Sequence, residues 1–153
     1  RSEALLADLI TLVDDLKRVQ VDGILNAVAA SDMREGIDQL FEGCVATLRK
    51  TLELHRTAGE LNSDRARQAL LDERERLLSE VERSVERLSD LLTELRMYAA
   101  TGKTDASLDD LAGALSRTLQ MARETDEEAD RWMSLGRDEK AIAGVVAKQK
   151  ETT

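Results

Sequence analysis

The chain has 153 residues, of which 42% are hydrophobic and 35% are charged, and it contains no proline. These proportions indicate a folded domain with a strongly charged surface, because disordered chains contain fewer apolar residues. The formal net charge of −9 argues against nucleic acid and anionic membrane surfaces as partners, since both attract clusters of Lys and Arg.

The composition also predicts an all-α fold. Leu, Ala, Glu and Arg predominate, and these residues have high helix propensity. The absence of proline leaves the interior of every helix uninterrupted. With one Phe, one Tyr and one Trp in the whole chain, the core is expected to be aliphatic. No stretch approaches the roughly 20 apolar residues that a membrane-spanning helix needs.

The first predicted helix extends from Ser2 to Ala30. Its apolar residues recur at intervals of four and three, which places them on one face of a helix. These residues are Leu5, Leu9, Leu12, Leu16 and Val19. A turn is predicted at Ala30 and Ser31. Asp32 and Glu35 then have the spacing of a capping box, which marks the start of a second helix.

The second predicted helix ends near Gly59, because glycine readily adopts the left-handed conformation that closes a helix. One side of this helix carries Ile37, Phe41, Cys44, Leu48, Leu52 and His55. A third helix is expected to begin at Asn62, Ser63 or Asp64, which are all good N-cap residues, and to stop at Gly102. Its inner face is predicted to consist of Leu78, Val81, Val85, Leu88, Leu92, Leu95 and Ala99.

The fourth predicted helix begins at one of three capping residues, Thr104, Asp105 and Ser107. Its inner face starts with Leu108, Leu111, Leu115, Leu119 and Ala122 and continues with Ala129, Trp132 or Met133, Leu135, Ile142 and Val146. Fraying or a break is expected at Gly136 and Gly144, since each glycine costs about 1 kcal/mol in a helix interior. Residues 148–153 are predicted to form a mobile tail.

Together these helices predict one architecture. Short turns between long helices force neighbouring helices to run antiparallel. The sequence therefore predicts a single domain, residues 1–147, folded as an antiparallel up-down-up-down four-helix bundle. The broad apolar faces of such slender helices also suggest a homodimer, in which a second copy covers part of them.

The sequence offers no residues with the spacing of a catalytic or metal site. Residues 102–104, Gly-Lys-Thr, resemble the end of a phosphate-binding loop, but that motif requires glycine where Met97 stands. His55 is the only histidine, and Ala58 replaces the lysine of the motif found in histidine phosphotransfer domains. Cys44 is expected to be a small buried hydrophobic residue. The chain is therefore predicted to be neither an enzyme nor a cofactor or metal-binding protein.

The last third of the chain contains candidate interface residues. Its acidic side chains would spread around a helix, either as a solvated face or as a docking patch for a basic partner. A tryptophan either marks an interface, because it buries a large area and keeps a polar N–H group, or covers one end of the bundle. The candidates are Trp132, Met133, Glu124, Glu127 and Glu128.

The order of segments resembles a known family. A long first helix is followed by the turn at residues 29–32, and the second helix then begins with charged residues at positions 33–35. A third helix begins in the polar stretch 63–73 and ends in an aliphatic run and a turn at residues 98–105. A helix rich in Leu and Ala follows at residues 108–122. This layout resembles the extracytoplasmic four-helix-bundle sensor domains of bacterial chemoreceptors and sensor kinases.

The resemblance implies a mechanical function. In that family two bundles pair, a small ligand binds near their interface, and one helix shifts against another; the fourth helix would be the output element. Because the chain opens at Arg1 rather than Met, we expect an excised or processed piece of a longer protein. The resemblance implies that this piece is the extracytoplasmic domain of a bacterial membrane receptor. The alternative hypothesis is a cytoplasmic scaffold or adaptor that binds other helices, for which long amphipathic helices and a charged surface suffice.

Overall fold

The computed structural model describes residues 1–19, 27–102 and 108–152. These residues form helices and no strand, which confirms the predicted all-α class. The helices are α1 (Ser2–Arg18), α3 (Ala27–Glu60), α4 (Asp64–Thr101), α5 (Leu108–Leu135) and α6 (Glu139–Glu151). The predicted number of four helices is therefore wrong for the described part of the chain, because the predicted fourth helix is divided into α5 and α6.

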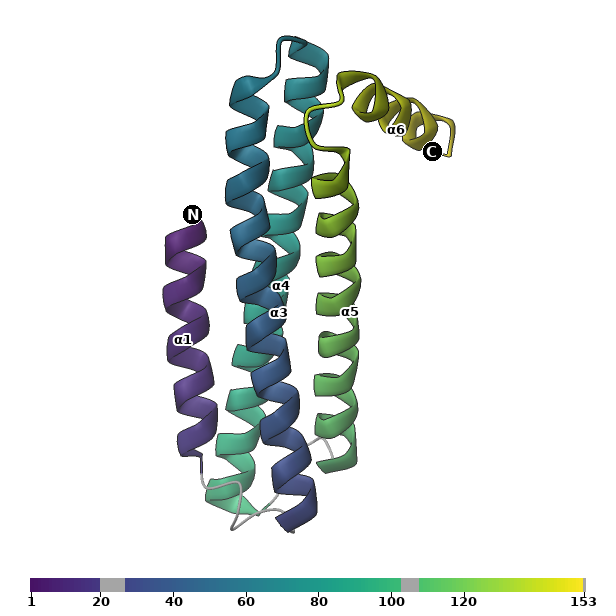
Figure 1. The fold of residues 1–153 in the computed structure, drawn as a ribbon. Coiled ribbons are helices and arrows are strands. Elements are labelled where there is room, and N and C mark those ends of the chain that lie inside the picture. The colour runs from purple at the N-terminus through teal and green to yellow at the C-terminus, as the bar shows by residue number, and fades with distance from the viewer. Residues whose placement is uncertain (20–26, 103–107, 153) are drawn as a thin grey trace.

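Four helices lie side by side along the long axis of the molecule, and α6 lies to one side near one end, where it packs against α4 (Figure 1). The helices α3 and α4 pack against each other, and both α1 and α5 pack against this pair from opposite sides. With 17 residues, α1 is about half as long as α3 and α4, which have 34 and 38 residues. It therefore covers only one half of their length (Figure 1).

The predicted boundary between the first two helices is wrong. Helix α1 already ends at Arg18, and α3 passes without a break through Ala30 and Ser31, where the sequence predicts a turn. Asp32 and Glu35 lie exposed within α3 instead of capping it. Acidic residues three positions apart also occur by chance on the solvent-facing side of an amphipathic helix. The spacing alone therefore does not identify a helix start.

The predicted closure of the second helix by a left-handed Gly59 is wrong, because α3 continues through this residue to Glu60 without a positive φ. Both ends of α4 agree with the sequence. Ser63 caps α4, because its hydroxyl accepts a hydrogen bond from the backbone N–H of Ala66 at 3.3 Å. The guanidinium group of Arg67 donates to the carbonyl oxygens of Ala58 and Leu61 at the end of α3. Gly102 closes α4 with φ of 65°, a left-handed conformation that glycine adopts without steric cost.

The boundary between α5 and α6 is also predicted correctly. Gly136 follows the last residue of α5 with φ of 53°. Asp138 then caps α6 by accepting hydrogen bonds from two backbone N–H groups at 3.1 Å. The second predicted break, at Gly144, is absent: α6 passes this residue and includes residues 148–151 of the predicted tail. Gly144 is exposed, so it disturbs no packing there.

The buried apolar side chains form two clusters. The first, here called the α1 cluster, joins α1 to α3, α4 and the first half of α5; its largest fully buried members are Leu9, Leu16, Ile37, Leu40, Leu78, Leu88 and Leu95. The second, the α6 cluster, joins α6 to the other ends of α3, α4 and α5; its members are Leu54, Ala58, Leu61, Ala66, Leu70, Leu77, Ala129, Trp132 and Ile142.

The buried face of α3 differs from the prediction in its second half. Its buried residues alternate at intervals of four and three and include two threonines. The residues of this series are Met33, Ile37, Leu40, Cys44, Thr47, Thr51, Leu54 and Ala58, and Leu48 is buried beside it. Leu52 is 53% exposed and His55 is also exposed, so their placement on the predicted inner face is wrong. The predicted face of α4 is confirmed from Leu78 to Leu95, whereas Ala99 is exposed.

Candidate functional site

Polar side chains separate the two clusters along α3 and α5. Thr47 and Thr51 of α3 are buried, and Thr51 donates its hydroxyl hydrogen to the carbonyl oxygen of Leu48 at 2.7 Å. On α5, Thr125 and Asp126 lie between the last residue of the α1 cluster and the first of the α6 cluster. Buried polar groups contribute less to cohesion than apolar side chains of the same size. This polar layer is therefore a weak point in the core.

Lys50 connects α3 to α5 in this polar layer. Its Nζ lies 2.7 Å from Asp126 Oδ1 and 2.6 Å from Asp130 Oδ1, and Thr47 donates to Asp126 at 3.2 Å. Burial by itself would lower the pKa of Lys50, but the hydrogen bonds and charges of the two aspartates outweigh it and raise this pKa. Lys50 is therefore a fully charged clamp that holds two carboxylates of α5.

The inner face of α5 combines three large residues with four small ones. Its positions alternate at intervals of four and three: Leu111, Leu115, Thr118, Ala122, Thr125, Ala129 and Trp132. Between Leu115 and Trp132 this face has no large side chain that would interlock with α3 and α4. Among the described residues 111–125, no charged group forms an ion pair. The first half of α5 is therefore held by Leu111 and Leu115 and, at its end, by the contact of Arg87 with the sulfur of Met121 at 2.8 Å.

Two grooves of about 410 Å³ each run along the two sides of this half of α5. The α4–α5 groove has an apolar floor and a rim of Arg87, Asp90, Glu94 and Arg117. The α3–α5 groove lies on the opposite side, and its rim consists of Asp32, Glu35, Gln39 and Ser116. Leu115 lines both grooves, so a change in either groove acts on the same anchoring side chain.

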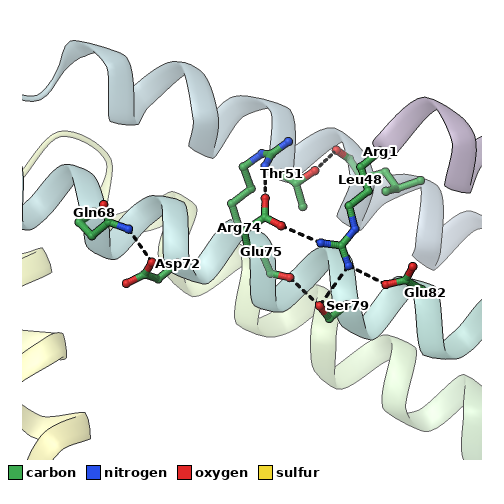
Figure 2. A network of polar contacts seen from close by, with 9 residues as sticks. All are labelled: Arg1, Leu48, Thr51, Gln68, Asp72, Arg74, Glu75, Ser79 and Glu82. Carbon is green, nitrogen blue, oxygen red and sulfur yellow. Dashed lines mark hydrogen bonds and ion pairs between the residues drawn. The ribbon is translucent and has the colours of Figure 1, made fainter.

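Helix α1 is attached to α4 by polar contacts near both of its ends. Figure 2 shows Arg1 between three side chains of α4: it contacts Glu75 at 2.7 Å, Glu82 at 2.6 Å and Ser79 at 3.4 Å. Near the other end of α1, Asp15 accepts a hydrogen bond from Arg96 at 3.0 Å. Exposed ion pairs each contribute little to stability, but together these contacts fix the position of α1 along α4.

A charged network connects α4, α5 and Trp132 near α6. The buried carboxylate of Glu73 accepts two hydrogen bonds from Arg76, at 2.6 and 2.9 Å, and these bonds raise the pKa of Arg76 despite its partial burial. Glu128 lies 3.9 Å from Arg76, also pairs with Arg131, and accepts the indole N–H of Trp132 at 3.2 Å. Each buried polar group of this network therefore has a partner.

The candidate interface residues occupy different surroundings. Trp132 is only 3% exposed and belongs to the α6 cluster, so it covers one end of the helices, and Met133 packs partly buried against the same cluster. Glu124 and Glu128 line one groove of about 450 Å³ together with Arg76 and Arg131. Glu127 is exposed and does not line that groove. The five residues therefore do not form one continuous surface.

The remaining candidate residues show no catalytic arrangement. Cys44 is buried, and burial raises the pKa of its thiol to about 12, although a hydrogen bond with Ser84 acts in the opposite direction. His55 is exposed on α3. Lys103 and Thr104, which belong to the sequence that resembles a phosphate-binding loop, fall outside the described residues. Within residues 1–19, 27–102 and 108–152, no group of acidic, His and Cys side chains is placed to hold a metal ion.

Sequence reasoning missed Lys50 and the two grooves. One feature of the sequence could have indicated them. Small and hydroxylated residues recur at the inner positions of α3 and α5, where leucines are expected. None of the described helices combines the length and the apolar character needed to cross a membrane. Comparison of the chain with protein-family models, with curated proteins and with solved structures finds no match in any of the three.

Proposed function

We propose that this chain is a non-enzymatic signalling module in which binding of a small ligand or a partner displaces α5 along α3 and α4. The α1, α3, α4 and α5 helices then act as an antiparallel up-down-up-down bundle, and α6 packs against the side of α4 near one end. The observation that carries the proposal is the uneven attachment of α5. Its first half lies between two grooves, whereas its second half is held by Lys50 and by Trp132.

The Lys50 clamp suits a displacement by one helical turn. Asp126 and Asp130 are four residues apart, which corresponds to about 6 Å along a helix. A shift of α5 by one turn would leave Lys50 beside one of the two carboxylates. Packed helices move between discrete arrangements rather than continuously, and the small residues Ala122 and Ala129 present little obstruction to such a movement.

A spin-labelled variant would test this displacement. Gln120→Cys on α5 and Ser89→Cys on α4 place labels on exposed positions that line neither groove, and the buried Cys44 stays protonated and unlabelled. We expect pulsed electron resonance to give a distance distribution with two populations, or one broad population spanning about 5 Å. A compound identified by a thermal-shift screen of amino acids, organic acids, purines and divalent metals should shift this distribution.

The matched control replaces the α5 label by one on α1. Thr11→Cys paired with Ser89→Cys reports on the helix that Arg1 and Asp15 attach to α4. This pair should give one narrow distance that no compound changes. Equally narrow distributions for both pairs, unchanged by every compound that raises the melting temperature, would exclude displacement of α5 as the mechanism.

A scaffold or adaptor function is the second candidate, and one observation favours it. Leu52 continues the line of Phe41, Val45 and Leu48 along α3, yet it is 53% exposed. An exposed leucine that continues a buried helix face can serve as a contact for another helix, either from a partner or from a second copy of this chain. Leu52→Lys should then abolish binding in a pull-down or dimerisation in ultracentrifugation, while Ser116→Lys on α5 should not.

A further inference from the structure

The α3–α5 groove has the size and lining of a site for a small molecule. Its apolar part consists of Met33, Leu115 and Leu119, together with Gly36 and Ala112. A volume of about 410 Å³ falls in the range of roughly 300–1,000 Å³ that is typical of small-molecule pockets. A helix of a partner protein would need a much longer surface. The occupant that fits is therefore a small molecule with an apolar portion.

Gly36 allows α3 to approach Leu115 of α5 closely at this groove. A Cβ atom at this position would lie 3.1 Å from Leu115 Cδ2, which is closer than most such contacts. The backbone of α3 itself therefore forms part of the groove wall, beside the side chain that anchors α5. A molecule that enters here touches Leu115 directly, so the groove is well placed to influence the position of α5.

The rim of the α3–α5 groove carries negative charge only. Asp32 has no hydrogen-bond or ion-pair partner among the described residues, and Glu35 accepts a hydrogen bond from the neutral amide of Gln39 at 2.9 Å. Neither Arg34, which lies between the two carboxylates in the sequence, nor Arg123, which donates to Gln39 at 2.7 Å, lines the groove. The α4–α5 groove differs, because Arg87 and Arg117 accompany its two carboxylates.

We propose that the α3–α5 groove binds a small organic cation with an apolar body. The ammonium group would lie between Asp32 and Glu35, and the hydrocarbon would cover Met33 and Leu115. The inference concerns binding and rests on the groove itself; it deepens the proposed function by naming the class of ligand that would move α5. Binding and displacement are measured separately, so failure of one is distinguishable from failure of the other.

The four methionines of the chain provide a local readout of binding. Met33 lines the α3–α5 groove, Met121 lines the α4–α5 groove, and Met133 packs against the α6 cluster. With ¹³C-methyl methionine in the whole chain, hexyltrimethylammonium should shift the Met33 signal in a saturable way and leave Met133 unchanged. Hexanoate should cause no shift. Each methylene added to the alkyl chain should tighten binding about four-fold until the groove is filled.

Two pairs of variants test the location and the charge. Ala112→Leu fills the α3–α5 groove and should abolish binding, whereas Ala114→Leu, two residues away in the α4–α5 groove, should preserve it. The double variant Asp32→Asn/Glu35→Gln should weaken binding roughly ten-fold, since it removes two solvent-exposed charge contacts. A control with the same change in net charge, Asp14→Asn/Glu42→Gln, alters exposed residues elsewhere and should bind like the wild type.

The outcomes that would overturn the inference are specific. They are the absence of any Met33 shift, a larger shift of Met121 than of Met33, or equal binding of hexanoate and hexyltrimethylammonium. Equal affinities of the two leucine variants would also place the ligand elsewhere. If Met33 shifts and the distance between labels at Gln120 and Ser89 does not change, the ligand class is confirmed and the proposed displacement of α5 is wrong.

Discussion

At the scale of single residues, burial determines the chemistry of Cys44. The side chain is 2% exposed and lies in the α1 cluster close to the polar layer. Because an ionised thiolate is poorly solvated in this position, burial raises the pKa to about 12 from the ordinary value of 9.0. The folded chain therefore keeps Cys44 protonated at pH values where the unfolded chain has already lost this proton.

This difference predicts a loss of stability at alkaline pH. Above pH 9 the unfolded state releases the Cys44 proton and the folded state retains it, so the free energy of unfolding falls by roughly 1.4 kcal/mol per pH unit towards pH 12. Urea unfolding between pH 8 and pH 11 should show this slope in the wild type and a smaller one in Cys44→Ala. Lys, Arg and Tyr residues titrate equally in both chains, so parallel curves would contradict the assignment.

At the scale of elements, glycine ends and polar caps were predictable because they act locally. Ser63, Gly102 and Gly136 each fix a helix end through their own backbone or hydroxyl group, without help from distant residues. The start of α3 was not predictable from Asp32 and Glu35, since an exposed acidic pair looks the same inside a helix and at its beginning. The all-α class follows from the composition for the same local reason.

The inner face of α3 was partly unpredictable because packing determines it. Thr51 is buried and Leu52 is exposed, although leucine is the more hydrophobic of the two residues. The short α1 helix and the arrangement of α4 and α5 select which side of α3 is covered. The candidate site depends on this selection, since Thr47 and Lys50 face α5 only in the observed register. A pattern of leucines alone therefore cannot locate the site.

Two glycines near α6 should respond in opposite ways to the same substitution. Gly136→Ala forces a side chain into a left-handed conformation and should destabilise the fold by about 1–2 kcal/mol. Gly144 lies exposed within α6, and an added Cβ atom meets nothing within 4 Å, so Gly144→Ala should stabilise α6 by about 0.5–1 kcal/mol. Urea unfolding followed by Trp132 fluorescence measures both. An equal loss in both variants would show that α6 does not pack as described.

The clamp between α3 and α5 predicts a coupling energy. Lys50→Met removes the cation and leaves Asp126 and Asp130 side by side, which should reduce stability by about 1–2 kcal/mol, between the values of exposed and buried pairs. In a double-mutant cycle, Asp126→Asn should lower this cost because it removes one of the two repelling charges. Lys140→Met changes an exposed lysine of α6 and should have an effect below about 0.5 kcal/mol. Strict additivity in the cycle would disprove the clamp.

At the scale of the whole molecule, the division of the core into two clusters determines how the chain should unfold. The α1 cluster depends on α1, a short helix that covers only one half of α3 and α4. The α6 cluster is closed by α6 and contains the only tryptophan of the chain. The helices α3, α4 and α5 extend through both clusters, so the clusters are connected by continuous backbone. The polar layer, however, removes apolar contacts between them along α3 and α5.

A matched pair of core variants tests whether this polar layer separates the clusters during unfolding. Leu9 in the α1 cluster and Leu70 in the α6 cluster are both fully buried, and truncation of either to Ala should cost about 2–5 kcal/mol. Circular dichroism reports on all helices, whereas Trp132 fluorescence reports on the α6 cluster.

In Leu9→Ala the loss of helix should therefore begin at a lower urea concentration than the change in fluorescence. In Leu70→Ala the fluorescence should change first or together with the helix signal, because the damage lies beside the tryptophan. Coincident transitions in both variants would mean that the three long helices unite the clusters into one cooperative unit, and that the polar layer acts on the position of α5 without weakening the fold as a whole.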